Sequence, residues 1–223
     1  MHPTFFRISR IPNILTQFQM PSKKLTRKFY SRTDTLVVAR DLLGKLLVVP
    51  SAEGQRVSGV IVEVEAYMAP EDKASHAFGN RRTIRTEPMF GNGGVAYVYF
   101  VYGMHFQFNV VVNAEGTPHA VLVRALEPVE GIELMKQRRG QSGRNLTNGP
   151  GKLCQAVGID LSLNREDLTG NRIWLEETGR RLTESEISSG PRIGVDYAEE
   201  FVHAPWRFWL SGNEYVSKTR GRN

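Results

Sequence analysis

The chain has 223 residues, 40% of them hydrophobic, which is enough to build one core of ordinary size. A single cysteine, Cys154, excludes a disulfide framework and a zinc site made of cysteines, and it fits a reducing compartment. No apolar run approaches the length that crosses a bilayer, so we expect no membrane partner.

The positive charge is concentrated at the two ends of the chain. The net charge is +6, but residues 1–33 hold seven basic residues and no acid, and residues 218–222 hold three more. The rest of the chain holds 19 basic residues and all 23 acids. The net charge of the whole chain therefore says little about the charge of its folded part. Two internal windows, 73–86 and 134–159, are basic and free of acids. They indicate either contacts with a phosphate backbone or ordinary solvated loops.

Three segments follow from composition. Residues 1–24 place apolar side chains between arginines without any acid, which is typical of a transit peptide. Met20 reads equally well as the true start of a bacterial chain. We therefore predict a flexible basic tail over 1–24, one folded domain over 25–217, and a basic C-terminal tail over 218–223.

Local signals in the first half predict a helix followed by two hairpins. Thr33 or Asp34 can cap the helix, and Gly44 can end it in a left-handed conformation. Turns at Glu53-Gly54 and at Gly103 separate strand-like runs. The predicted elements are a helix to Leu43, strands over 45–49 and 57–67, a polar loop over 68–92, and strands over 95–102 and 106–113.

The second half predicts further strands and two helices. Pro150 and Gly158 mark the start and end of one helix. The predicted elements are strands over 121–126, 172–176, 206–210 and 215–217, and helices over 129–138 and 150–157. This order lacks the strand-helix alternation of a Rossmann sheet. It predicts a single α+β domain with a curved, mainly antiparallel sheet, a tyrosine-bearing hairpin and peripheral helices.

The strand over 57–67 places two acids and an aromatic on one face. Side chains alternate along a strand, so Glu63, Glu65 and Tyr67 share a face opposite a row of apolar residues. Buried carboxylates are costly unless they are paired. The face is therefore either solvated or part of a cleft that contains cations.

An arginine in an apolar strand supplies a candidate cation. Arg124 interrupts the run 121–126, and its guanidinium needs an anion if it is buried. Glu65 is the attractive partner, while Glu127 or solvent are the alternatives. In the strand over 95–102, which is rich in tyrosine, Tyr102 stands at the turn and can project from its tip, whereas Tyr99 can stay within a pocket.

The residues offer two other candidate sites. Glu63, Glu65, Asp72 and His76 could form a metal site, but no helical His-Glu spacing or second histidine supports one. The run Gly149-Pro150-Gly151 either opens a helix whose free amides face a phosphate or is a plain helix start.

Seven ordered motifs resemble one known family. They are VEVEAY (62–67), EDxAxH (71–76), MF (89–90), YVYxxYGM (97–104), RALEPxEG (124–131), GPxKLCQA (149–156) and RIGV (192–195). In this order they are similar to the alkyladenine (3-methyladenine) DNA glycosylase family. The resemblance implies a monofunctional hydrolase for base-excision repair that removes alkylated or deaminated purines (3-methyladenine, 7-methylguanine and hypoxanthine type) without a metal or cofactor.

The resemblance also implies how a base is held. An enzyme that acts on a stacked base must extrude the nucleotide and fill the gap. Tyr102 would be the intercalating wedge, and Tyr67 and Tyr99 would sandwich the flipped base. His76 would lie against the base and its sugar-phosphate, and Asn109 would read the purine edge.

The same resemblance assigns the chemistry to Glu65. Glycosidic cleavage passes through a sugar with oxocarbenium character, so a carboxylate can activate water and stabilise the positive charge. Arg124 would hold Glu65 and the water in place and favour the ionised carboxylate. Glu63 is left without a role, although a structural one, such as tying down a neighbouring loop, is favoured.

Partners and location follow from this activity. We expect damaged double-stranded DNA as the partner of a monomer, with Arg81, Arg82 and Lys152 contacting the backbone on position alone. The expected location is the cytoplasm with its nucleoid in a bacterium, or the nucleus or an organelle in a eukaryote. The alternatives are a nucleic-acid-binding module without catalysis, for which basic windows and aromatics would suffice, and a metal-dependent nuclease.

Overall fold

The computed structural model describes residues 23–217. The tails predicted over 1–24 and 218–223 therefore lie outside the described residues, except for Lys23 and Lys24. Lys24 forms an antiparallel bridge with Glu176, so this residue belongs to the edge of the sheet rather than to a tail. Within residues 23–217, no helix is long and apolar enough to cross a membrane.

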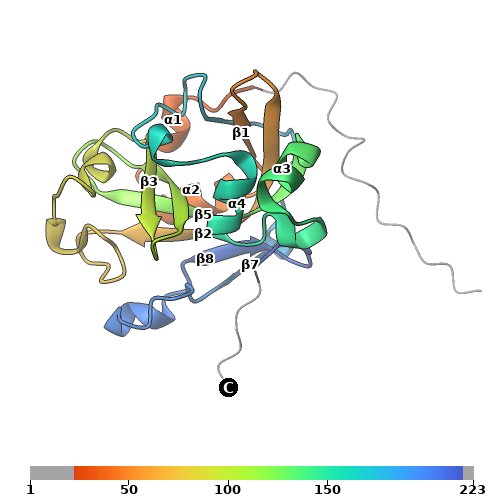
Figure 1. Cartoon of the computed structure of the whole chain (residues 1–223). Helices are drawn as coiled ribbons and strands as arrows, with labels where there is room; N and C mark the ends of the chain where they lie inside the picture. The colour runs from red at the N-terminus through yellow and green to blue at the C-terminus, as the bar shows by residue number, and fades with distance from the viewer. Residues whose placement is uncertain (1–22, 218–223) are drawn as a thin grey trace, which may run out of the picture.

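One eight-stranded sheet organises the chain (Figure 1). Its main path is β3-β4-β5-β2-β1-β6, with β8 pairing β2 and β7 pairing β8. All of these strand pairs are antiparallel, which confirms the predicted α+β class. The strands are β1 (Leu46–Pro50), β2 (Arg56–Met68), β3 (Ala96–Val101), β4 (His105–Val112), β5 (His119–Glu130), β6 (Trp174–Glu176), β7 (Ile187–Gly190) and β8 (Arg207–Leu210).

Strand β2 lies at the centre of this arrangement. One of its edges pairs with β5, and the other pairs first with β1 and then, from Glu63 to Glu65, with β8. The register against β5 shifts on both sides of Glu63, which marks an irregularity there. Since neighbours pair with both edges, the acids of β2 stand in the interior of the sheet.

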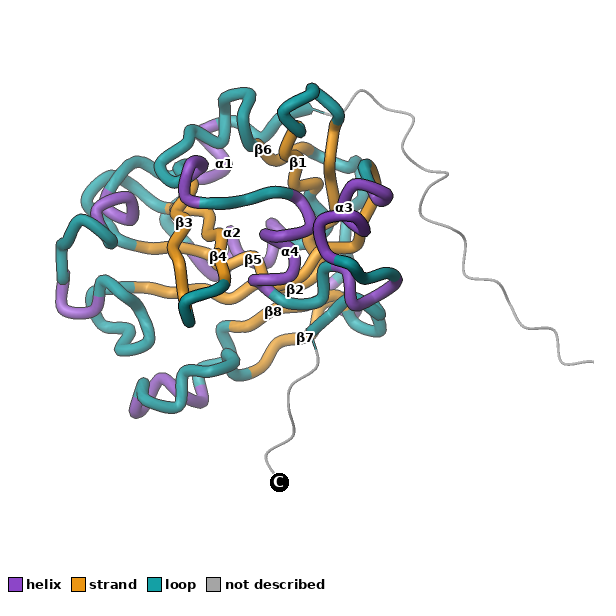
Figure 2. Tube along the Cα trace, in the orientation of Figure 1, coloured by secondary structure: helices purple, strands orange, loops and turns teal. Residues whose placement is uncertain are grey.

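The helices are short and surround the strands. Asp34 caps α2 by accepting a hydrogen bond from the Val37 amide, as the sequence predicts. The α-helices are α1 (Arg27–Tyr30), α2 (Thr35–Leu42), α3 (Ile132–Arg139) and α4 (Pro150–Val157). The 3-10 helices are η2 (Phe78–Asn80), η3 (Glu87–Phe90), η4 (Gly143–Leu146), η5 (Leu161–Leu163), η6 (Glu184–Glu186) and η7 (Glu199–His203). Figure 2 shows the orange strands running through the middle of the molecule, with long teal loops around them.

Two predictions about elements need correction, and two short elements were not predicted. The helix predicted from Val129 begins only at Ile132, because β5 continues to Glu130 and Gly131 then turns the chain at a φ of +71°. The predicted strand over 215–217 is a turn instead, and it pairs with no strand. The short strand β7 and the one-turn helix α1 were not predicted.

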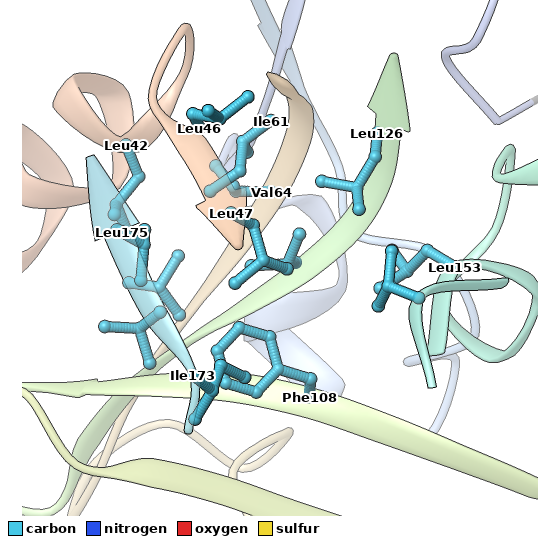
Figure 3. Packing of buried hydrophobic residues seen from close by; sticks show 14 of the residues in the cluster. Leu42, Leu46, Leu47, Ile61, Val64, Phe108, Leu126, Leu153, Ile173 and Leu175 are labelled. Carbon is cyan, nitrogen blue, oxygen red and sulfur yellow. The ribbon is translucent and has the colours of Figure 1, made fainter. Parts of the chain in front are cut away.

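The main core forms where the helices pack on the sheet. Helix α2 packs on β2, and α4 packs on β4 and β5. Figure 3 shows side chains from several strands, with Leu42 of α2 and Leu153 of α4, gathered in this cluster. Leu47, Ile61 and Phe108 are fully buried there. This packing anchors β2 and β5, and these two strands carry the acids and the arginine of the candidate site.

Candidate active site

Glu65 is fully buried and hydrogen bonded on both carboxylate oxygens. Its Oε2 accepts hydrogen bonds from Tyr67 Oη at 2.8 Å and from Arg124 Nη1 at 3.1 Å. Its Oε1 accepts from the Ile193 amide at 2.7 Å. The side chain has no exposed surface. The solvated alternative for this strand face is therefore wrong, and the predicted partnership of Arg124 with Glu65 is confirmed.

Arg124 also binds the second acid of the strand. Its Nε donates to Glu63 Oε1 at 3.0 Å, so one guanidinium bridges both carboxylates. Glu63 accepts two more hydrogen bonds from Ser217, through the amide at 2.7 Å and the hydroxyl at 2.8 Å. Glu63 thus has a structural role that the sequence left open, since it fixes Arg124 and anchors the end of the described chain. We call Glu63, Glu65 and Arg124 the carboxylate layer.

Charge and burial keep Arg124 and Tyr67 protonated. Burial alone would lower the pKa of Arg124, but the negative charges of Glu65 and Glu63 outweigh it and raise the pKa. Burial, and then the charge of Glu65, raises the pKa of Tyr67 well above its ordinary value. The guanidinium therefore stays charged, and the phenol keeps the proton that it donates to Glu65.

A second buried ion pair, between Arg192 and Asp72, packs against the Tyr67 ring. Arg192 donates to both carboxylate oxygens of Asp72, at 2.5 and 2.8 Å, and to the Ala66 carbonyl at 2.9 Å. Its guanidinium lies 4.7 Å from the centre of the Tyr67 ring and 5.0 Å from that of Trp206. Arg192 also precedes Ile193 in the chain, and the Ile193 amide binds Glu65. Sequence reasoning gave Arg192 no role, although it lies within one of the motifs.

A cavity of about 160 Å³ opens beside these residues. The two tyrosines predicted to stack a base, Tyr67 and Tyr99, both line it. Glu65 lies behind Tyr67 and Arg124 and does not line the cavity itself. The other lining residues with polar side chains include His76, Asn109, Tyr102, Arg124, Gln107, Tyr97 and Tyr197. The structure therefore brings together the predicted base-binding residues, and it adds Gln107 and Tyr197, which sequence reasoning missed.

Hydrogen bonds fix the aromatic wall of the cavity. Tyr99 Oη donates to Gln107 Oε1 at 2.5 Å, and burial raises the pKa of Tyr99. Asn109 is buried, and its Nδ2 donates to the Tyr97 carbonyl at 3.2 Å. The Tyr99 ring therefore has a defined position before any ligand enters.

His76 is held in one tautomer. The guanidinium of Arg85 can only donate, so His76 Nε2 accepts from Arg85 Nη2 at 3.3 Å. Nδ1 then carries the hydrogen and donates to Tyr97 Oη at 2.9 Å. Burial, followed by the charge of Arg85, lowers the pKa of His76 to about 4. The imidazole is consequently neutral near pH 7.

Tyr102 projects from the turn between β3 and β4. The turn closes with a hydrogen bond from the Met104 amide to the Val101 carbonyl at 3.3 Å. Tyr102 and Gly103 both have positive φ, +56° and +69°. The Tyr102 side chain is 80% exposed, and Phe100 and Met104 are exposed beside it. We call residues 100–104 the hairpin tip.

The three predicted backbone contacts are dispersed. Arg82 is paired with Glu87 at 2.8 Å, and Lys152 Nζ donates to Asn148 Oδ1 at 2.8 Å. Arg81 and Arg85 line a hollow beside the cavity. None of the three lines the cavity.

The acids weighed for a metal site already have other partners. Glu63 and Glu65 bind Arg124, and Asp72 binds Arg192. His76 binds Tyr97 and Arg85. In the part of the chain that the structure describes, no group of three or more histidine, cysteine, aspartate or glutamate side chains is placed to hold a metal ion.

Comparisons with known proteins identify the family of the chain. The family model described as methylpurine-DNA glycosylase matches residues 28–214. A protein of Desulfitobacterium hafniense, provisionally named 3-methyladenine DNA glycosylase, is 52% identical over 87% of this chain and 98% of its own length. Proteins of the same name from Clostridium acetobutylicum and Bacillus cereus are 50% and 51% identical, over 97% and 95% of their own lengths and 87% and 83% of this chain. The chain therefore belongs to the methylpurine-DNA glycosylase family, and it is a DNA-repair hydrolase of the N-glycosylase type.

Proposed function

We propose that this protein flips alkylated or deaminated purines out of duplex DNA and hydrolyses the N-glycosidic bond with a water activated by Glu65. The observation that carries the proposal is the position of Glu65. Its carboxylate is bound by Arg124 and Tyr67, which both line an aromatic cavity. The substrates would be purines of the 3-methyladenine, 7-methylguanine and hypoxanthine type.

The cavity supports recognition of a flipped base. Stacking of a base on an aromatic ring contributes roughly 1–3 kcal/mol, and Tyr67 and Tyr99 present two such rings. Asn109 and His76 add polar groups at the same wall. Tyr102 would enter the stack that the base leaves, because its ring is exposed at the hairpin tip.

The carboxylate layer supports the chemical step. An ionised carboxylate can accept about four hydrogen bonds, and Tyr67, Arg124 and Ile193 donate three to Glu65. The remaining acceptor capacity suits one water, whose proton Glu65 would take as it attacks C1′ of the sugar. The negative charge of Glu65 would also stabilise the developing oxocarbenium ion.

Contacts outside the cavity would bind the duplex. Arg81 lines a hollow beside the cavity, and Lys152 lies in the first turn of α4. A phosphate that binds Arg82 would have to replace Glu87, whose ion pair with Arg82 lies at the surface. Each phosphate contact should weaken binding when it is removed and should reduce the dependence on salt.

Incubation with defined duplexes tests the proposal. Oligonucleotides that carry one 7-methylguanine, one hypoxanthine or one undamaged guanine should be incubated with the full chain, and released bases should be separated and identified. Release of damaged purines with an intact abasic strand is the expected result. Cleavage of the strand without base release, or identical behaviour on damaged and undamaged DNA, would refute it.

A further inference from the structure

Both tyrosines of the proposed base sandwich carry a guanidinium against their rings. Arg192 lies 4.7 Å from the ring centre of Tyr67, and Arg85 lies 4.8 Å from that of Tyr99. Neither arginine lines the cavity. Each therefore contacts its tyrosine from outside the space that a base would occupy.

The two arginines differ in how their charge is balanced. Arg192 is buried and forms two hydrogen bonds with the carboxylate of Asp72. Arg85 is exposed and forms none of the ion pairs within residues 23–217. Its Nη2 donates instead to the neutral ring of His76. Arg124 is likewise balanced by Glu63 and Glu65. Among these three arginines next to the cavity, Arg85 alone adds an unbalanced positive charge.

This charge matters because the candidate bases differ in their own charge. Alkylation at a ring nitrogen such as N7 leaves the purine positively charged, whereas a deaminated purine is neutral. A cationic base on Tyr99 would share the electron-rich ring with the Arg85 guanidinium and would be repelled by it. A neutral base would meet neither penalty.

We infer that Arg85 is a specificity-determining residue that lowers the preference of the cavity for positively charged alkylated purines relative to neutral deaminated ones. The inference rests on the proposed function. Arg85 would act through the Tyr99 ring and through His76, which it holds with Nε2 as an acceptor. The neutral imidazole adds no charge of its own, so the exposed side chain of Arg85 sets the charge beside Tyr99.

Removing the positive charge of Arg85 while keeping a hydrogen-bond donor at this position tests the role. Arg85→Gln removes the positive charge, and Arg85→Lys retains it and is the matched control. Single-turnover excision should be measured at saturating protein on two duplexes of one sequence, with 7-methylguanine or hypoxanthine at the same position. Spontaneous loss of 7-methylguanine is measured without protein and subtracted.

The readout is the ratio of the two rates, cationic over neutral. Arg85→Gln should raise this ratio about three- to tenfold, as expected for loss of one partly screened charge near the base. Arg85→Lys should stay within about twofold of the wild-type ratio. Thermal unfolding of both variants should match the wild type, because the side chain is exposed.

Three results would overturn the inference. An unchanged ratio with both rates lowered equally would make Arg85 a contact to the DNA backbone. A ratio in Arg85→Lys that equals that of Arg85→Gln would assign the effect to the shape of the guanidinium rather than to its charge. Wild-type protein that releases neither base would refute the proposed function itself, and the inference with it.

Discussion

The carboxylate layer and the hairpin tip lie on the same sheet but are built in opposite ways. Glu63 and Glu65 have no exposed surface, and each is bound by Arg124 and by donors from distant segments. Tyr102 is 80% exposed and stands at positive φ. The proposed chemistry thus has a fixed position in the core, while the proposed wedge is presented to the outside with little to hold it.

This difference has an energetic basis. Buried charges persist only when they are paired, and removing one partner leaves the other without compensation. An exposed aromatic at a turn contributes little to folding and can be selected for binding alone. Substitutions in the carboxylate layer should therefore affect stability and activity together. Substitutions at the hairpin tip should separate them.

The most decisive test of the carboxylate layer replaces each of its two acids separately. Glu65→Gln should lower the single-turnover excision rate by about 100-fold or more, the range that a general base contributes, while damaged DNA is still bound. Glu63→Gln is the matched control, since Glu63 is equally buried but binds Ser217 instead of Tyr67.

The control should lose much less activity than Glu65→Gln. Rates should be compared at temperatures at which both variants are folded, as judged by circular dichroism. If Glu65→Gln excised damaged purines near the wild-type rate, the assignment of Glu65 as the general base would be wrong. Equal losses in both variants would mean that the two acids share one role.

Removing the shared cation should cost more stability than any other single change considered. Arg124→Met leaves two buried carboxylates without their common partner, and such a loss costs about 3–5 kcal/mol. Arg82→Met is the control, because its pair with Glu87 is exposed, so solvent screens the attraction and its loss should change stability much less. Urea unfolding of the three proteins measures both values. Comparable losses in the two variants would contradict a special role for the buried layer.

At the hairpin tip, activity and stability should move independently. Tyr102→Asn removes the ring, and the loss of the wedge should slow excision from duplex DNA about tenfold or more. Because asparagine tolerates positive φ better than tyrosine, the free energy of unfolding should stay equal or rise by up to about 1 kcal/mol. Tyr102→Phe keeps the ring and should retain most of the rate. Unchanged excision by Tyr102→Asn would remove the wedge from the mechanism.

Much of the fold followed from local signals. Asp34 before α2, Gly103 at the tyrosine turn, and Pro150 with Gly158 around α4 each act within a few residues, so the sequence marks them directly. The extension of β5 to Glu130 is set by pairing with β2, far along the chain. No local pattern encodes such a pairing, which explains why the start of α3 was placed too early.

The candidate site shows the same division. Alternation along β2 and the need of Arg124 for an anion predicted the contact with Glu65, because both are properties of single strands. The partners of the other acids are 120 or more residues away, Arg192 for Asp72 and Ser217 for Glu63. Only the folded chain brings these segments together, so the roles of Glu63 and Arg192 required the structure.

The smallest predicted effect concerns His76, which stands at the wall between the two regions. Its pKa is about 4 in the folded chain and 6.5 in an ordinary environment, so the unfolded chain binds the proton more readily. Stability should therefore be complete above about pH 6.5 and should fall as the pH drops toward 4. At pH 5 the loss attributable to His76 should be about 1–2 kcal/mol. His76→Gln cannot take up this proton, and its unfolding free energy should vary less between pH 7 and 5 than that of the wild type. Urea unfolding at both pH values measures the difference, and parallel pH profiles would show that His76 is solvated rather than held neutral by burial and Arg85.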